Sequence, residues 1–150
     1  MKADFEPVRD FTKVHNALFT LYTRLPDFKA EHAMLYTYLM ARFNPSYGYA
    51  FPTSCDIALA LNCGINQVTA YKRVLKKYGL IATRRHPTYG NDVYTLRAPI
   101  VEEAEFYAAF PDASDYYERR LAQLSARKER PDKADAVEDT GEMAALADWL

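Results

Sequence analysis

The sequence predicts a mainly α-helical domain with a small β-hairpin, followed by a helical extension. Apolar residues recur at three- and four-residue spacing through most of the first 80 residues. Two short apolar-rich runs flank a turn near residue 90, and helical spacing resumes after residue 100. The 150 residues are 49% hydrophobic and 14% aromatic, which is enough to bury the core of one ordinary domain with accessory segments.

The first two predicted helices span residues 11–25 and 29–42. Asp10 is placed to cap the first helix, and Pro26 ends it. The apolar stripe of the first helix consists of Phe11, Val14, Leu18, Leu21, Tyr22 and Leu25. The stripe of the second consists of Ala33, Tyr36, Leu39, Met40 and Phe43.

The next predicted helix is short and is followed by a tight turn. A turn and an extended piece, residues 44–52, lead into this helix, which ends near Leu61. Thr53 and Asp56 match a capping box at its start, with Asp in place of Glu. Residues 62–64 then form the tight turn.

A longer helix over residues 67–78 and a hairpin complete this unit. Asn66 is a good N-cap for the helix, and Gly79 is the expected residue just beyond its end. The inward face of the helix holds Val68, Tyr71, Leu75 and Tyr78. The hairpin strands are expected at 80–86 and 93–97.

The predicted extension contains two helices, 101–110 and 114–128, separated by Pro111. The second has a stripe of Tyr117, Leu121 and Leu124. Two hypotheses for this stripe are equally open. It packs on its own domain, or it forms a homodimer interface. The chain thus divides into a main unit at 1–99, a helical extension at 100–129 and an acidic segment at 130–150, which has little to bury and is expected to be disordered until its short apolar end.

The net charge of −1 hides a division along the chain. Residues 1–99 hold 13 Lys and Arg against 7 Asp and Glu, a net charge of +6, whereas residues 100–150 hold 6 against 13, a net charge of −7. No acidic residue lies between Asp56 and Asp92, a stretch with six basic residues. Such a patch indicates an anionic partner, usually nucleic acid, although a solvated helix face would have the same composition.

The order of these elements is that of a winged helix-turn-helix, in which the helix after the tight turn enters the major groove of DNA. Removing the inward face of this helix leaves Asn66, Gln67, Thr69, Ala70, Lys72, Arg73, Lys76 and Lys77 as candidate DNA-binding residues. Gln and Arg can read adenine and guanine, Thr and Ala can touch a thymine methyl, and the two later lysines suit phosphate. The hairpin adds Arg84, Arg85, His86, Tyr89 and Asn91, and strand alternation sends Arg84 and Arg85 to opposite faces.

Residues 11–96 also resemble a known family. The matching runs include Lys13-Val14, Asn16 to Phe19, Tyr38-Leu39, Arg42 to Asn44, Ala50 to Thr53, Ile57-Ala58, Cys63 to Ile65, Gly79 to Ile81, and Asn91 with Val93-Tyr94. In these runs the chain is similar to the N-terminal winged-helix domain of phage and plasmid replication initiators of Gram-positive bacteria. Phage replication protein O and the helicase-loading primosome protein DnaD have related domains. The resemblance implies duplex DNA binding at a replication origin. The C-terminal domain through which the primosome family contacts helicase is not visible in this sequence.

Other classes of function find little support. The sequence has no phosphate-binding Gly-rich loop, no acid–base pair and no metal-ligand spacing, so we expect no enzyme, no cofactor and no metal. Two cysteines exclude a disulfide scaffold, and both are interpreted as small core residues of a cytoplasmic protein. No apolar run approaches a membrane span. Most of the twelve tyrosines, such as Tyr36, Tyr71 and Tyr78, fall on inward faces, which favours core packing over base stacking.

Three functions are therefore considered. The first is a sequence-directed double-stranded DNA-binding protein that starts replication of a phage, plasmid or conjugative element. The second is a transcriptional regulator with the same DNA contacts, and the third is a winged-helix adaptor that binds protein. The apolar end of the chain resembles a tethered recognition peptide for a replisome protein, with Leu146, Trp149 and Leu150 as its candidate contacts; a frayed end is the alternative.

Overall fold

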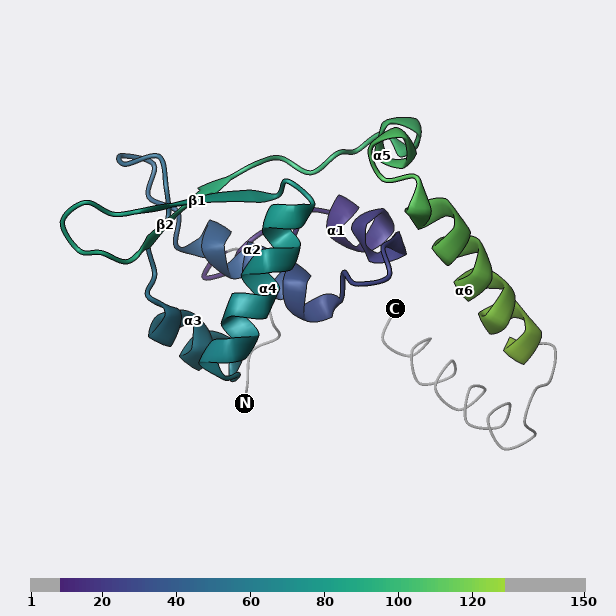
Figure 1. Cartoon of the computed structure of the whole chain (residues 1–150), viewed down its shortest axis with the longest axis horizontal. Helices are drawn as coiled ribbons and strands as arrows, with labels where there is room; N and C mark the ends of the chain where they lie inside the picture. The colour runs from purple at the N-terminus through teal and green to yellow at the C-terminus, as the bar shows by residue number, and fades with distance from the viewer. Residues whose placement is uncertain (1–8, 129–150) are drawn as a thin grey trace.

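The computed structural model describes residues 9–128 and contains mostly helix with one two-stranded antiparallel sheet (Figure 1). In chain order the elements are α1 (Ala17–Thr20), the 3-10 helix η1 (Tyr22–Arg24), α2 (Ala30–Ala41), α3 (Ser54–Leu61), α4 (Ile65–Lys77), β1 (Ile81–Arg85), β2 (Asp92–Leu96), α5 (Glu103–Ala109) and α6 (Asp112–Lys128). The predicted fold class, mainly α with a small hairpin in winged helix-turn-helix order and a C-terminal helical extension, is confirmed.

The core lies between α2, α4 and the helical segments before α2. Among its fully buried side chains are Leu18, Phe28, Leu35, Leu39, Ile57, Val68, Leu75 and Leu80. Phe106 of α5 joins the same core, where its ring meets Tyr22 edge-on with centroids 5.2 Å apart. The hairpin projects from one end of the molecule and α6 from the other (Figure 1).

The first helix, predicted over residues 11–25, is confirmed only in its second half, as the short helix α1 and the 3-10 helix η1. Regular structure begins only at Ala17, and Phe11 and Val14, which the pattern placed on the inward stripe, are about half exposed. Asp10 does not cap a helix, because the first helix begins at Ala17 and its N-cap residue is Asn16. At the other end, Pro26 forces Leu25 into extended backbone, and the chain tightens into the 3-10 turn η1 before it.

The capping box that starts α3 is confirmed. The Asp56 amide donates to Thr53 Oγ1 at 3.1 Å, and the Thr53 amide donates to the Asp56 carboxylate at 3.0 Å. These bonds lower the pKa of Asp56, so its carboxylate stays charged. Cys55, by contrast, is exposed and not a core residue, because it lies about 200° around the helix from Ile57, which fills the core.

Helix α4 begins two residues earlier and ends one residue earlier than predicted, and the predicted role of Gly79 just beyond its end is confirmed. Beyond its C-terminus, Gly79 has a φ of +71°, its amide bonds the carbonyl of Lys76, and the Leu80 amide bonds the carbonyl of Leu75 at 2.9 Å. This is a Schellman motif, in which the left-handed residue favours glycine. At the N-terminus the cap residue is Gly64, so Asn66 lies inside the first turn and is not the N-cap.

The extension packs on the helices through its first half. The guanidinium of Arg24 lies 4.1 Å from the centroid of the Tyr117 ring, which fixes the start of α6 against η1. Further along α6, Leu121 and Leu124 are about half exposed, so that part of the stripe does not pack on its own domain. The predictions for residues 130–150, including Leu146, Trp149 and Leu150, lie outside the described residues.

Candidate nucleic-acid interface

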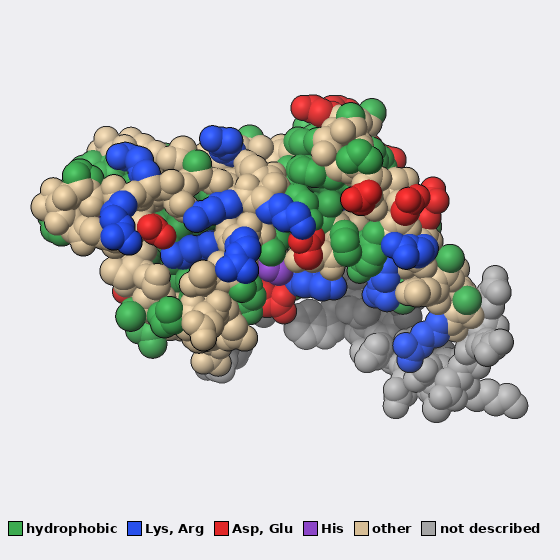
Figure 2. Space-filling view, in the orientation of Figure 1, with side chains coloured by type: hydrophobic (Ala, Val, Ile, Leu, Met, Phe, Trp, Pro, Cys, Tyr) green, Lys and Arg blue, Asp and Glu red, His purple; other side chains and the backbone are tan. Residues whose placement is uncertain are grey.

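Basic side chains gather over α4 and the hairpin on one face of the molecule (Figure 2). Every α4 residue predicted to face outward is exposed except Lys72. Those that carry charge are Arg73, Lys76 and Lys77, and Arg85 extends the row along β1. We refer to these four residues as the basic face. The helical period therefore places the acid-poor stretch of the sequence on one surface.

Lys72 is not part of the basic face, which corrects the prediction that it points outward. Its side chain is only 9% exposed, and its ammonium lies 3.3 Å from the Asp92 carboxylate and 3.4 Å from Ser54 Oγ. The ring of Tyr94 covers it, with the centroid 5.1 Å from Nζ. The spacing of the sequence already indicated that Lys72 is buried, because it lies four residues after Val68 and three before Leu75, on the buried stripe of the helix.

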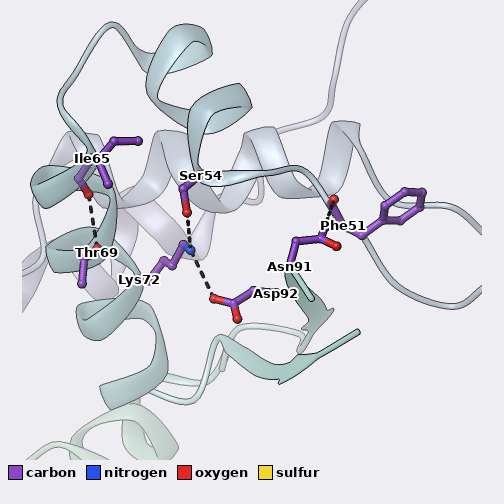
Figure 3. A network of polar contacts seen from close by, with 7 residues as sticks. All are labelled: Phe51, Ser54, Ile65, Thr69, Lys72, Asn91 and Asp92. Atoms are coloured by element: carbon purple, nitrogen blue, oxygen red, sulfur yellow. Dashed lines mark hydrogen bonds and ion pairs between the residues drawn. The ribbon is translucent and has the colours of Figure 1, made fainter. Parts of the chain in front are cut away.

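Two polar links join the wing, meaning the hairpin β1–β2 with its loop 86–91, to the helices (Figure 3). One runs from Ser54 at the start of α3 through Lys72 of α4 to Asp92 at the start of β2. The other is a hydrogen bond of 2.9 Å that the side-chain Nδ2 of Asn91 donates to the backbone carbonyl of Phe51, just before α3. Together they fix the base of the wing against α3 and α4, so the wing and the basic face keep one relative geometry.

The side chains at the start of α4 are partly used within the helix. The carboxamide oxygen of Gln67 accepts a hydrogen bond from the backbone amide of Gly64 at 2.8 Å. The Thr69 hydroxyl donates to the carbonyl of Ile65 at 3.2 Å, as Figure 3 shows. Bidentate reading of adenine needs both ends of a Gln amide. Gln67 would have to share its oxygen with the helix cap to read adenine in this way.

In the last turn of α4, the positive charge of Lys77 is offset by the carboxylate of Asp27. Lys77 Nζ lies 2.8 Å from the carboxylate of Asp27, which also accepts a hydrogen bond from the Tyr78 hydroxyl. Burial alone would raise the pKa of Asp27, but the bonds from Lys77 and Tyr78 outweigh it and lower that pKa. Asp27 is therefore ionised at neutral pH and offsets the charge of Lys77. Arg73 and Lys76 have no such neighbour in the ion pairs formed within residues 9–128.

Strand alternation separates the two wing arginines. Arg85 pairs with Asp92 in the antiparallel register, and residues directly opposite one another share a face of a sheet. Because Asp92 contacts Lys72 of α4, Arg85 lies on the α4 side of the hairpin. Arg84 projects to the far side, where its guanidinium lies 5.1 Å from the centroid of the Tyr49 ring.

The wing loop is held by its own histidine. His86 Nδ1 accepts the amides of Thr88 and Tyr89 at 3.1 and 3.2 Å, and the His86 amide bonds the carbonyl of Asn91 at 2.8 Å. The loop closes at Gly90, whose φ is +72°. Tyr89 packs on the His86 ring and is nevertheless 76% exposed. In this arrangement His86 shapes the loop, and Tyr89 is a side chain that the loop presents to solvent.

Neither a metal centre nor a membrane span is found in the part of the chain that the structure describes. Over residues 9–128, no three His, Cys, Asp or Glu side chains lie together in a way that could hold a metal ion. Within the same range, no helix combines the length and the apolar character needed to cross a bilayer.

Several solved structures share this fold at low sequence identity. A Rep–DNA complex matches with a TM-score of 0.51 and 23% identity, over 71% of this chain and 88% of that one. An MDR initiator matches with a TM-score of 0.51 and 21% identity, over 70% and 94%. The N-terminal domain of a DNA-binding protein matches with a TM-score of 0.53 and 20% identity, over 76% and 98%. No protein-family model and no curated protein matches the sequence. These likenesses establish the winged-helix fold.

Proposed function

We propose that this protein binds double-stranded DNA through α4 and the wing. The observation that carries the proposal is the coincidence of three features on one surface. The acid-free stretch of the sequence, the helix that follows the tight turn and the α4 side of the hairpin all contribute to the basic face (Figure 2). An exposed helix fits the major groove, and a flanking basic strand fits the adjacent backbone.

The exposed residues divide into two roles. Asn66, Thr69 and Ala70 lie on the first two turns of α4, where a recognition helix meets base edges, and Arg73, at the start of the third turn, suits guanine. Lys76, Lys77 and Arg85 lie further out and suit phosphate. Lys72 contributes indirectly, because it ties the wing to α4.

We further propose that the protein starts replication of a phage, plasmid or conjugative element. Support comes from the family resemblance of residues 11–96 and from the fold shared with a Rep protein and an MDR initiator. A transcriptional regulator with the same DNA contacts is the alternative. Mapping of bound sites separates the two, because an initiator is expected on iterated repeats at an origin and a regulator at a promoter.

The proposed duplex contact is tested by fluorescence anisotropy of a labelled random duplex at several salt concentrations. Three to five phosphate contacts predict a slope of about −3 to −4.5 in log K against log salt. The double change Arg73→Glu and Lys76→Glu should abolish binding at the lowest salt.

The matched control reverses the same number of charges on α6, with Arg119→Glu and Arg120→Glu, two exposed residues far from the wing. This control should keep the affinity and slope of the native chain. Equal losses in both variants would refute the basic face as the binding surface. Absence of binding by the native chain at low salt would leave the adaptor hypothesis.

A further inference from the structure

The far side of the wing presents an unexpected group of aromatic rings. Tyr47, Tyr49 and Phe51, which we call the aromatic platform, lie in the loop between α2 and α3. The rings of Tyr47 and Tyr49 stack with centroids 5.7 Å apart and planes 20° apart, and Phe51 meets both rings at 6.0 Å. Tyr47 is 59% exposed and Phe51 40% exposed. Packing of the core does not explain rings that remain this accessible.

The backbone fixes the platform to the hairpin. Ala50 and Tyr94 exchange backbone hydrogen bonds of 3.0 and 2.7 Å, so residues 49–51 lie along the edge of β2. Ala50 and Tyr94 are buried on the core side of this edge. Successive side chains of an extended segment point to opposite sides, so Tyr49 and Phe51 point away from the core, where Arg84 packs over Tyr49. The platform and the basic face therefore lie on different sides of the hairpin.

Two grooves adjoin the platform and share Arg42 and Phe51. One has a volume of about 440 Å³ and includes Phe43 among its lining residues. The other has a volume of about 330 Å³ and reaches Tyr89 at the wing loop. Both volumes fall within the range of pockets that hold a small ring system. The two grooves thus place exposed aromatic rings along one path.

The charges near this path favour an anionic chain with planar groups. Arg42 and Arg84 are both exposed residues. One carboxylate, that of Asp56, lines the second groove and stays charged, so it offsets one of the two arginines and leaves one positive charge in excess beside the path. Phosphates are therefore expected beside the two arginines, and bases beside Phe51 and Tyr47. Stacking on aromatic side chains with adjacent arginine is how single strands are bound without sequence preference.

We propose that the aromatic platform is a second nucleic-acid site, which binds the unpaired bases of single-stranded DNA. It is separate from the proposed duplex contact, because it uses Arg84 and the far side of the wing. A protein with both sites would hold a duplex on α4 and a separated strand on the platform. The wing would then lie between the two.

The test compares two probes with the full chain: a short oligothymidine, and an abasic oligomer of the same length with the same phosphates. The measured quantity is the ratio of the two affinities at moderate salt, where phosphate contacts are screened. Stacking of even one base should make this ratio at least about 5. Tyr47→Ala should reduce it to about 1, and Tyr47→Phe, which keeps the ring, should preserve it.

Phe19→Ala is the matched control, because Phe19 is also 59% exposed and lies on α1. It should leave the ratio unchanged. A ratio near 1 for the native chain would overturn the proposal, and so would a ratio that Tyr47→Ala does not change. A Tyr47→Ala variant that converts a dimer to a monomer and leaves the ratio unchanged would show that a second copy covers the platform, which also overturns the proposal.

Two further measurements keep the outcome unambiguous. The Tyr47→Ala variant should bind duplex with the affinity of the native chain. The proposal for the platform and the proposal for the duplex contact are therefore tested independently. If Tyr47→Ala does not fold, photo-cross-linking of the native chain to 5-iodouracil oligonucleotides replaces it. Cross-links within residues 43–51 support the platform, and cross-links confined to α4 overturn it.

Discussion

The link between Lys72 and Asp92 should respond very differently to loss of either partner. The Lys72 side chain is 9% exposed, whereas that of Asp92 is 37% exposed. Asp92→Asn leaves an ammonium enclosed by Ser54 and the ring of Tyr94, without a counter-charge. Lys72→Met leaves a carboxylate that water can reach, and the new side chain fills the space of the lysine stem.

The structure sets the size of the two effects. Breaking a fully buried ion pair costs about 3–5 kcal/mol, and an exposed pair contributes about 0–1 kcal/mol. Because Asp92 is partly solvated, we expect Asp92→Asn to lower the free energy of unfolding by about 2 kcal/mol. Lys72→Met should lower it by about 1 kcal/mol or less. For a domain of this size the difference corresponds to about 4 °C in melting temperature.

Urea unfolding followed by circular dichroism measures both values. The control is Glu103→Gln, which removes an exposed carboxylate that lies 3.7 Å from the guanidinium of Arg24 and should change stability by less than about 0.5 kcal/mol. The reasoning is refuted if Lys72→Met is as costly as Asp92→Asn, or if Asp92→Asn cannot be told from the control. Both changes should also speed hydrogen exchange in the wing loop, because they release the base of the wing.

Three other results are expected. Lys76→Ala should weaken duplex binding more than Lys77→Ala in the anisotropy assay, because Asp27 already offsets the charge of Lys77; equal losses would contradict this. Burial lowers the pKa of His32, so the unfolded chain takes up the proton first, and the free energy of unfolding should fall between pH 7 and 5.5. In urea titrations at both pH values, His32→Gln should reduce that fall. The Tyr94 hydroxyl is buried without a hydrogen-bond partner in the described residues, so Tyr94→Phe should leave the melting temperature unchanged or raise it.

The sequence was most informative where local chemistry and periodicity agreed. The Thr53–Asp56 capping box and Gly79 fixed the start of α3 and the end of α4, and each hairpin strand was predicted to within one residue at either end. Residue type misled the prediction at Lys72. Its position belongs to the buried stripe, but a lysine is buried only when a counter-charge is present, and Asp92 lies 20 residues further along the chain.

The first helix and the aromatic platform depend on contacts that no local pattern contains. The amide of Ile100 donates to the Tyr22 hydroxyl at 3.1 Å, a link across 78 residues that holds the turn at η1. The platform lies in a stretch whose turn residues were interpreted correctly, with Gly48 at a φ of 79°. The exposure of Tyr47 follows only from the pairing of Ala50 with β2, which tertiary structure decides.

The two neighbouring arginines of β1, Arg84 and Arg85, belong to different proposed binding sites. A strand sends consecutive side chains to opposite sides, so Arg84 and Arg85 cannot serve one surface. Arg85 lies beside α4 through its pairing with Asp92, and Arg84 lies over Tyr49. A charge reversal at Arg85 should therefore weaken duplex binding, and the same change at Arg84 should weaken binding of single strands. If both changes weakened the same interaction equally, the division of the wing into two binding sides would be wrong.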